Sequence, residues 1–324
     1  MAHLAIYTER STIRSSVELT ALSNFRAAAF ELGHKADFLF KNELQYLRAY
    51  DAVLIRALTD PLNTAYVVAR WAELAGKRVL DTSDSIRICC DKVAMYRRLT
   101  RAAVPMPVTR FLGEDRIDLR HASTLFEELG TPLVLKAPNS SFSAYVDKVT
   151  TTEAFVRVGQ RFLRRADRLV VQQYLPSHFD WRVITLHGRV LAVLQYRFAV
   201  DAWRTMERAR DGAPTVVLGV PRDDAPPALL ATAIAAAAAI GDSLYGVDLK
   251  EIDGDYVVIE VNDNPTIAAT EEDQANPEIY AEIIRYLVDG EASFDDASSR
   301  GASSDGASAG GASSGGASSG AAPS

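Results

Sequence analysis

The stretch from residue 246 to residue 267, GVDLKEIDGDYVVIEVNDNPTI, constrains the fold more than any other part of the chain. Apolar and polar residues alternate on both sides of an Asp253-Gly254 pair, a pattern that predicts two β-strands joined by a tight turn. The apolar set, which would face a core, is Val247, Leu249, Val257, Ile259 and Val261. The polar set is Asp248, Lys250, Glu260 and Asn262. The chain therefore contains a hairpin with one apolar and one polar face.

The register of this hairpin decides whether its polar residues share a face. A plain two-residue turn would place Asp248 opposite Ile259 and leave Glu260 on the other face. A three-residue connection or a β-bulge would set Asp248 across from Glu260, with Asn262 one pleat further, and we predict this arrangement. It gathers two carboxylates and an amide oxygen, the ligand types that Mg²⁺ prefers. The alternative is the solvated polar face of an amphipathic hairpin.

Composition limits the classes of protein and partner. The 324 residues are 48% hydrophobic, which is enough to bury the cores of two or three structural units. A formal charge of −7, with no basic run, argues against nucleic-acid binding. We therefore expect small-molecule or peptide partners, and the oligomeric state stays open.

Cysteine usage and hydropathy indicate the compartment. The only cysteines, Cys89 and Cys90, are adjacent, so a structural disulfide of the secreted type is not expected, and they are interpreted as core or helix-start residues rather than a redox pair. The N-terminus lacks a signal-peptide pattern, and the Ala-rich run 228–240 is too short to span a bilayer. We expect a cytoplasmic protein without membrane contact.

The first 84 residues alternate between short apolar runs and helical segments. Such alternation predicts a small parallel α/β unit. The expected strands are 4–7, 36–40, 52–56 and 78–80, and the expected helices are 17–32 and 64–75.

The next part of the chain mixes hairpins with helices. Expected strands are 108–112, 133–137, 169–173, 181–186 and 189–196, and expected helices are 91–103, 122–129, 153–165 and the Ala-rich run. A last helix would start with Asn276 as N-cap and Pro277 as its first residue, and would end near residue 287.

After Gly290 the sequence consists mainly of Gly, Ala and Ser. We interpret residues 291–324 as a disordered tail, and recognition or modification of the tail is the alternative. Deleting it should leave the melting temperature unchanged, because such a segment buries too little apolar surface to offset its ordering entropy. Thermal melts of the full-length and shortened proteins check this. A fall of several degrees would show that the tail docks.

One lysine stands inside an apolar run. Lys136 lies in LVLKA, where an unpaired ammonium would cost several kcal/mol, so it needs an anion. The segment 138–145 (PNSSFSAY) offers hydroxyl and backbone N–H donors that suit phosphate. The alternative is a lysine that reaches solvent from a strand end.

Four blocks in order resemble the ATP-grasp superfamily, specifically its RimK-like carboxylate–amine ligases. The blocks are DKVAMYRRLTRAAVPMPVT (91–109), LVLKAPNSSFS (133–143), VVQQYLP with DWRV (170–183) and the hairpin. The sequences of these blocks are most similar to those of an uncharacterised RimK-like group with its own N-terminal domain. The resemblance implies a mixed α/β and α+β fold, with a small pre-ATP-grasp-like parallel domain (1–86), a two-subdomain ATP-grasp domain (87–290) and the tail.

The resemblance also implies a site for ATP between the two subdomains. Lys92 and Lys136 would contact the phosphates, and Asp180 would lie near ribose or phosphate. The main chain of Gln172, Gln173, Tyr174 and Leu175 would hold adenine. Arg182 would meet the phosphate or an acyl-phosphate. Asp248, Glu260 and Asn262 match the family's ligands for Mg²⁺, with Mn²⁺ as the alternative ion.

Two positions depart from the family pattern. The phosphate loop, 140–145, lacks glycine, and Gln173 stands where relatives often carry Glu. Arg197 and Arg204 are further candidates for contact with the acyl substrate.

The implied function is a Mg²⁺-dependent, ADP-forming ligase. It would activate a carboxylate as an acyl-phosphate for attack by an amine, expected to be that of an amino acid or peptide, and Lys136 and Arg182 would be its catalytic cations. The alternatives are a non-catalytic ATP-binding sensor and an ATP-grasp kinase.

Overall fold

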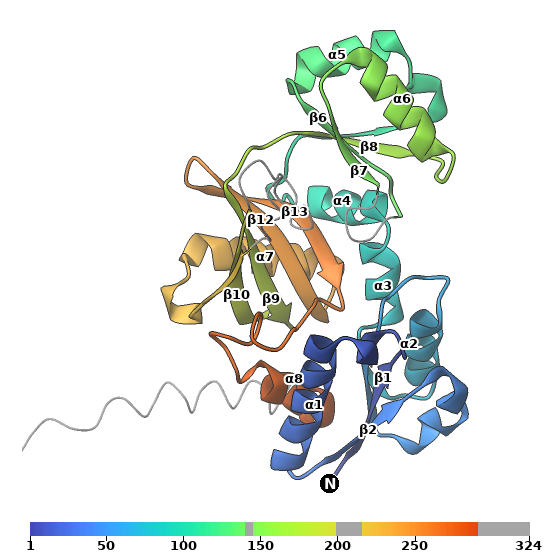
Figure 1. The fold of residues 1–324 in the computed structure, drawn as a ribbon, viewed down its shortest axis with the longest axis vertical. Coiled ribbons are helices and arrows are strands. Elements are labelled where there is room, and N and C mark those ends of the chain that lie inside the picture. The colour runs from blue at the N-terminus through green and yellow to red at the C-terminus, as the bar shows by residue number, and fades with distance from the viewer. Residues whose placement is uncertain (140–144, 199–215, 291–324) are drawn as a thin grey trace, which may run out of the picture.

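The computed structural model describes residues 1–139, 145–198 and 216–290. The predicted phosphate loop from residue 140 to 144, Arg204 and the tail lie outside the described residues. Three β-sheets organise the chain, one parallel and two antiparallel (Figure 1). This mixture confirms the predicted α/β and α+β fold class. The division of the chain at residue 86 stays a prediction.

The N-terminal unit is a four-stranded parallel sheet in the order β2-β1-β3-β4. Its elements are β1 (His3–Thr8), η1 (Thr12–Arg14), α1 (Ser16–Glu31), β2 (Lys35–Leu39), η2 (Lys41–Ala49), β3 (Ala52–Arg56), α2 (Thr64–Leu74) and β4 (Arg78–Leu80). Alternate residues of β1 point to opposite sides of the sheet, and both sets are apolar and buried, so helices cover both faces. Leu4 and Ile6 pack toward α1, whereas Ala5 and Tyr7 pack toward α2.

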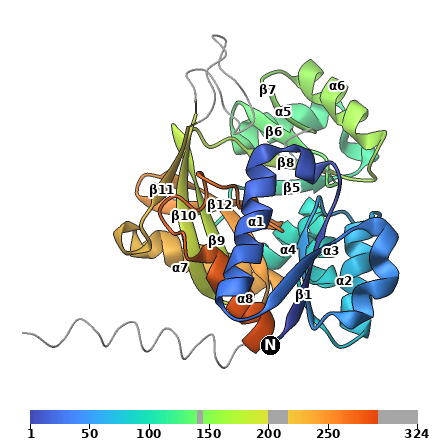
Figure 2. The ribbon, with the colours of Figure 1, turned by 60° about the horizontal axis from the view of Figure 1, so that its bottom comes forward.

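The last helix, α8 (Ile279–Asp289), returns to this N-terminal unit and lies beside α1 (Figures 1 and 2). Phe25 of α1 meets Tyr280 edge to face, with 4.8 Å between ring centroids. The predicted cap of this helix is wrong. The helix begins two residues after Pro277, and the Asn276 amide donates to the Val220 carbonyl oxygen instead. The amide therefore serves a tertiary contact that the local sequence does not reveal.

The second sheet has four strands in the order β5-β8-β6-β7 and carries two helices (Figure 1). Its elements are β5 (Thr109–Leu112), η3 (Glu114–Arg116), α5 (Leu119–Leu129), β6 (Leu133–Lys136), β7 (Val146–Val149), α6 (Thr152–Leu163) and β8 (Leu169–Gln173). It is linked to the N-terminal unit by α3 (Ser83–Cys89) and α4 (Lys92–Arg101). Asp91 caps α4 by accepting from the backbone N–H groups of Val93 and Ala94.

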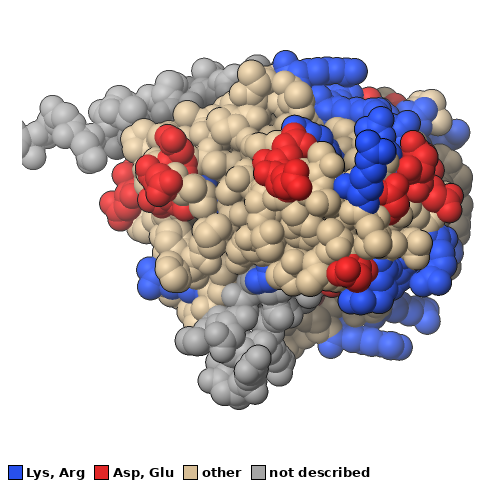
Figure 3. All heavy atoms as spheres, turned by 90° about the horizontal axis from the view of Figure 1, so that it is seen from above, with Lys and Arg blue, Asp and Glu red and all other residues tan. Residues whose placement is uncertain are grey.

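Lys and Arg side chains gather over the α5–α6 end of the molecule, where Asp and Glu interrupt them (Figure 3). Arg157, Arg161, Arg164 and Arg165 belong to α6 and the residues that follow it. The negative net charge of the chain is therefore unevenly spread over its surface.

The third sheet has five strands in the order β11-β10-β9-β12-β13. Its elements are β9 (Phe179–Leu186), β10 (Arg189–Arg197), β11 (Val216–Val220), η4 (Arg222–Asp224), α7 (Pro227–Ile240), β12 (Leu244–Ile252) and β13 (Asp255–Asp263). The Ala-rich run forms α7, as predicted, and packs with α4 on one face of the sheet. Among the described residues, no helix has the length and apolar character needed to cross a membrane.

The two cysteines are free thiols. Cys89 is buried at the C-terminal end of α3, where it packs in a core, and Cys90 follows it. The interpretation as core residues is confirmed for Cys89, whereas neither residue starts a helix.

Candidate active site

A cavity of about 410 Å³ lies where the second and third sheets face each other, with the N-terminal unit at one end. The residues that the family resemblance assigns to ATP, Mg²⁺ and catalysis line it: Lys92, Lys136, Gln172, Gln173, Tyr174, Leu175, Asp180, Arg182, Asp248, Glu260 and Asn262. The fold thus brings together side chains from α4 and from strands of both antiparallel sheets. Their roles remain predictions.

The hairpin β12–β13 has the predicted register. Asp248 pairs with Glu260, because a β-bulge separates that pair from the next one, Leu249 with Val258. The turn itself has two residues, and Asp253 and Gly254 have positive φ angles of 53° and 89°, as a type I′ turn requires. The bulge rather than a longer turn sets the register.

The bulge also corrects the predicted core face of β13. Val258 and Tyr256 are buried in the core, whereas Val257 and Ile259 are only partly buried. Ile259 lines the cavity. The inserted residue shifts the alternation by one position, so the core positions N-terminal to the bulge were assigned to the wrong parity.

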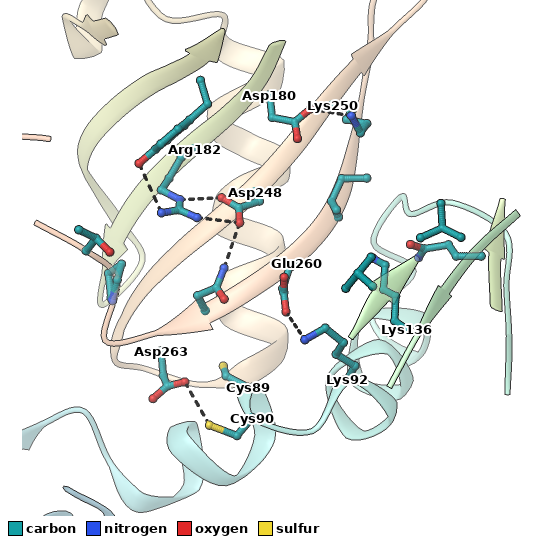
Figure 4. Close-up of a pocket in the computed structure, with 18 of the residues that line it drawn as sticks. Cys89, Cys90, Lys92, Lys136, Asp180, Arg182, Asp248, Lys250, Glu260 and Asp263 are labelled. Carbon is teal, nitrogen blue, oxygen red and sulfur yellow. Dashed lines mark hydrogen bonds and ion pairs between the residues drawn. The ribbon is translucent and has the colours of Figure 1, made fainter. Parts of the chain in front are cut away.

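Arg182 and Asp248 form a two-pronged ion pair across β9 and β12 (Figure 4). Arg182 Nε donates to Asp248 Oδ1 at 2.7 Å and Nη2 to Oδ2 at 2.9 Å. The Asn262 amide donates to the same Oδ2 at 3.0 Å. Burial raises the pKa of Asp248 above its usual value, although Arg182 opposes the shift. Burial also acts against the charged guanidinium, but Asp248 outweighs it, so the pKa of Arg182 is raised.

Two buried lysines approach Glu260 from the opposite side of the cavity (Figure 4). Lys92 Nζ lies 2.8 Å from Glu260 Oε1, and Lys136 Nζ donates to the Tyr96 hydroxyl at 2.8 Å. Burial favours a raised pKa for Glu260, but Lys92 and Lys136 outweigh it and lower that pKa. Burial lowers the pKa of Lys136, and the carboxylates of the cavity oppose this.

The predicted adenine segment ends β8 and passes into a loop. Gln173 N–H donates to the Val108 carbonyl oxygen, and the Gln172 side chain donates to Thr109 Oγ1 at 2.9 Å. Lys148 lies 4.7 Å from the centroid of the Tyr174 ring. These contacts tie the segment to its neighbouring strands.

Asp180 makes an ion pair that was not predicted. Its Oδ1 lies 2.7 Å from Lys250 Nζ and accepts from the Ser177 hydroxyl at 2.9 Å. Lys250 lines the cavity, and the sequence signal for it was its place in the polar set of the hairpin.

A second unpredicted group adjoins Arg182. The Tyr196 hydroxyl donates to Glu272 Oε1 at 2.6 Å, and the Arg182 guanidinium lies 4.9 Å from the Tyr196 ring centroid. Both residues line the cavity. Arg197 is exposed and donates to Gln195, so it does not reach this cavity.

The N-terminal unit meets the hairpin end through buried acids. Asp81 accepts from the Ser243 hydroxyl at 2.8 Å, and Arg56 donates to the Asn264 side chain at 2.7 Å. Burial raises the pKa of Asp81 to about 6 and, with Asp81 adding to the effect, the pKa of Asp263 to about 8.

The donor set fits a hard cation together with a phosphate ligand. Within the described ranges, no cluster of three or more His, Cys, Asp or Glu side chains could hold a metal ion alone. Asp248, Glu260 and the Asn262 amide oxygen are the oxygen donors here, and Mg²⁺ usually binds through few carboxylates, its own waters and substrate phosphates. Lys92 and Lys136 supply the positive charge that suits such phosphates.

Comparison with known proteins gives concordant results. The family model described as RimK-like ATP-grasp domain matches residues 89–287. The chain is 27% identical over 256 residues to a "Probable alpha-L-glutamate ligase" of Chromohalobacter salexigens, covering 78% of this chain and 80% of the relative. A protein of the same name from Thioalkalivibrio sulfidiphilus is 30% identical over 228 residues, covering 69% and 72%.

A solved structure shares the fold. The D-alanine–D-alanine ligase of Bacillus anthracis superposes with a TM-score of 0.68 at 16% identity, covering 90% of this chain and 97% of that one. The same ligase complexed with ATP gives a TM-score of 0.66 at 16% identity, covering 93% and 100%.

Proposed function

The chain belongs to the RimK-like ATP-grasp family, and we propose that it is an ATP-dependent, ADP-forming ligase that joins a carboxylate to an amine. One observation carries the proposal: two buried lysines, an arginine and the hairpin's carboxylates converge on one cavity between two sheets. A sensor that only binds ATP has no need for Arg182 and both hairpin carboxylates in one place. Consumption of ATP fits the cytoplasmic location expected from the sequence.

The chemistry requires cations more than a protein nucleophile. A carboxylate is a poor electrophile, so one of its oxygens attacks the γ-phosphorus of ATP, and the bond from that phosphorus to the bridging oxygen of ADP breaks. The amine then attacks the carbonyl carbon of the acyl-phosphate, and phosphate leaves. In the first step negative charge spreads over the transferring group, and positioned cations stabilise it.

The proposed roles follow position in the cavity. Main-chain groups of residues 172–175 hold adenine at one end, and Asp180 with Lys250 lies beside them. Lys92 and Lys136 bind the phosphates. A Mg²⁺ ion held by Asp248, Glu260 and Asn262 would supply charge neutralisation for the phosphates. Arg182 faces the group that receives the phosphoryl.

The proposed substrates are an amino acid and a carboxylate of an amino acid or peptide. The names of the curated relatives make L-glutamate the first amine to test. ADP release is measured with Mg²⁺-ATP and pools of amino acids and dipeptides, and products are identified by mass spectrometry. A ligase releases ADP together with an amide product. ATP binding without ADP release would indicate a sensor, and a stable phosphorylated product would indicate a kinase.

Glu260→Gln should weaken the response to Mg²⁺. The substitution keeps the shape but removes the charge that faces the proposed ion, so we expect the Mg²⁺ concentration for half-maximal ADP release to rise about 10- to 100-fold. A Mg²⁺ titration at saturating ATP measures this. Asp255→Asn, at the exposed start of the same strand, is the matched control. Unchanged Mg²⁺ dependence in Glu260→Gln would remove the metal assignment.

A further inference from the structure

The chain that leaves β13 is held by the N-terminal unit through Asn264. Its backbone N–H donates to the Asp81 carboxylate, and its side-chain Nδ2 donates to the Ala57 carbonyl oxygen. Arg56 Nη1 donates to the side-chain Oδ1 at 2.7 Å. Arg56 ends β3, Ala57 follows it, and Asp81 follows β4. Asn264 therefore contacts the N-terminal unit at three points.

These contacts hold a backbone conformation that the local sequence disfavours. Asn264 has a positive φ of 42°, whereas a residue that precedes a proline, as Asn264 precedes Pro265, is usually extended. Asn tolerates the left-handed region better than most residues, but such a conformation persists only where the surrounding structure fixes it. Arg56 Nη1 also donates to the Pro265 carbonyl oxygen, at 2.9 Å. The sharp turn after β13 thus depends on the N-terminal unit.

The acid that holds Asn264 also holds the other strand of the hairpin. Asp81 Oδ1 accepts from the Ser243 hydroxyl at 2.8 Å and from the Leu244 N–H at 3.2 Å, while Oδ2 accepts from Asn264. Only 1% of the Asp81 surface is exposed. Because buried polar networks whose members are bonded are rigid, this network fixes the open end of the hairpin β12–β13.

The turn at Asn264 lies next to a proposed metal ligand. A single residue, Asp263, separates Asn264 from Asn262. Asn262 Nδ2 donates to Asp248 Oδ2 at 3.0 Å, which leaves the amide oxygen of Asn262 to face a metal ion. Asn262, Asn264 and Pro265 all line the cavity. A change in the path of the chain at Asn264 would therefore shift the Asn262 oxygen.

We propose that Asn264 is a positioning residue of the metal site: held by the N-terminal unit, it fixes the orientation of the Asn262 amide oxygen toward the ion. This rests on the proposed function, and specifically on the Mg²⁺ ion proposed there. It gives the N-terminal unit a part in binding the ion without supplying a ligand. The competing role is structural, in which the contacts of Asn264 join the two parts of the chain and affect stability alone.

The test uses Asn264→Gly, because glycine adopts a positive φ and keeps the backbone N–H that Asp81 accepts, while both side-chain contacts are lost. The probe is Mn²⁺, whose binding is measured without turnover from the electron paramagnetic resonance signal of the free ion, at a fixed concentration of ADP. We expect the dissociation constant for Mn²⁺ to rise about 10-fold. The Mg²⁺ concentration for half-maximal ADP release should rise by the same factor, while kcat at saturating Mg²⁺ changes far less.

A double-mutant cycle separates the two roles. If Asn264 acts through Asn262, Asn264→Gly should not weaken Mn²⁺ binding further in an Asn262→Ala background. Equal weakening in both backgrounds, or unchanged Mn²⁺ binding in Asn264→Gly, would overturn the proposal. Arg56→Lys decides if Asn264→Gly does not fold. It keeps the buried charge but not the guanidinium geometry, so it should weaken Mn²⁺ binding in the same direction, and unchanged binding would count against positioning.

Ser85→Ala is the matched control. It removes the contact between the Ser85 and Tyr245 hydroxyls, 2.7 Å apart, which joins α3 to β12, and it leaves the contacts of Asn264 in place. Melting temperatures are measured for every variant, and Mn²⁺ binding is compared at a temperature where all are folded. Weaker Mn²⁺ binding in Asn264→Gly alone supports positioning. Equally weakened binding in Ser85→Ala would overturn the assignment to Asn264.

Failure of the proposed function is seen separately, as absence of ADP release by the wild type with every acid and amine tested. The Mn²⁺ cycle needs no turnover, so it tests the role of Asn264 in that case as well. A wild type that binds no Mn²⁺ in the presence of ADP would overturn the metal site and the role of Asn264 together.

Discussion

Lys136→Met is expected to abolish turnover while the fold persists. Lys136 lies at the end of β6 with 5% of its surface exposed, and its ammonium faces the cavity that holds the proposed phosphates. Removing a positioned charge from such a site lowers kcat by about 100- to 1,000-fold, and loss of a charge-assisted contact weakens ATP binding by about 10-fold or more. ADP release and calorimetric titration with ATP measure the two effects.

The fold should tolerate this change, because methionine fills a similar volume and the Tyr96 hydroxyl still donates to the Ile259 carbonyl oxygen at 2.7 Å. Lys35→Met, on the exposed edge of β2, is the matched control. Lys92 is as buried as Lys136, so Lys92→Met should reduce turnover and ATP binding to a comparable extent. Equal ATP affinity in wild type and Lys136→Met would contradict the phosphate role.

The sequence predicts the site best where local pattern and position along a strand determine geometry. The period-two alternation and the Asp253-Gly254 turn predicted the hairpin. The need to gather oxygen donors predicted the register that sets Asp248 opposite Glu260, and of the two devices that could produce it, a longer connection or a bulge, the chain uses the bulge. The isolated lysine in LVLKA was found because an interior ammonium needs a partner. In these cases the physical requirement is visible within about twenty residues.

Partners from distant parts of the chain were not predictable in this way. Tyr96 reaches Lys136 across 40 positions, and Tyr196 reaches Glu272 across 76. Nothing near these residues in the sequence shows which elements will meet. The wrong prediction for Asn276 has the same cause. Its sequence context is typical of an N-cap, but its side-chain amide donates to the Val220 carbonyl oxygen of β11 instead. Tertiary contacts override local preference at such positions.

Substitution of Arg182 should separate phosphoryl transfer from ATP binding. The guanidinium sits between Asp248, the Tyr196 ring and the cavity, so its charge is fixed before any substrate arrives. If Arg182 stabilises charge that develops during transfer to the carboxylate, Arg182→Ala should lower hydroxamate trapping about 100- to 1,000-fold while ATP affinity changes only a few-fold. Arg182→Lys keeps the charge but loses the two-pronged geometry, so its trapping should lie between wild type and Arg182→Ala.

Arg182→Ala also leaves the Asp248 carboxylate without its ion-pair partner, and removing one member of a buried pair destabilises the fold. Its melting temperature must therefore be measured beside trapping, and the comparison made at a temperature where wild type and variants are all folded. Trapping that falls in Arg182→Ala and partly returns in Arg182→Lys, with ATP affinity constant, requires a role for the charge in the transfer itself. Lost ATP affinity with unchanged trapping at saturating ATP would instead make Arg182 a nucleotide contact, and the group that receives the phosphoryl would have to lie elsewhere in the cavity.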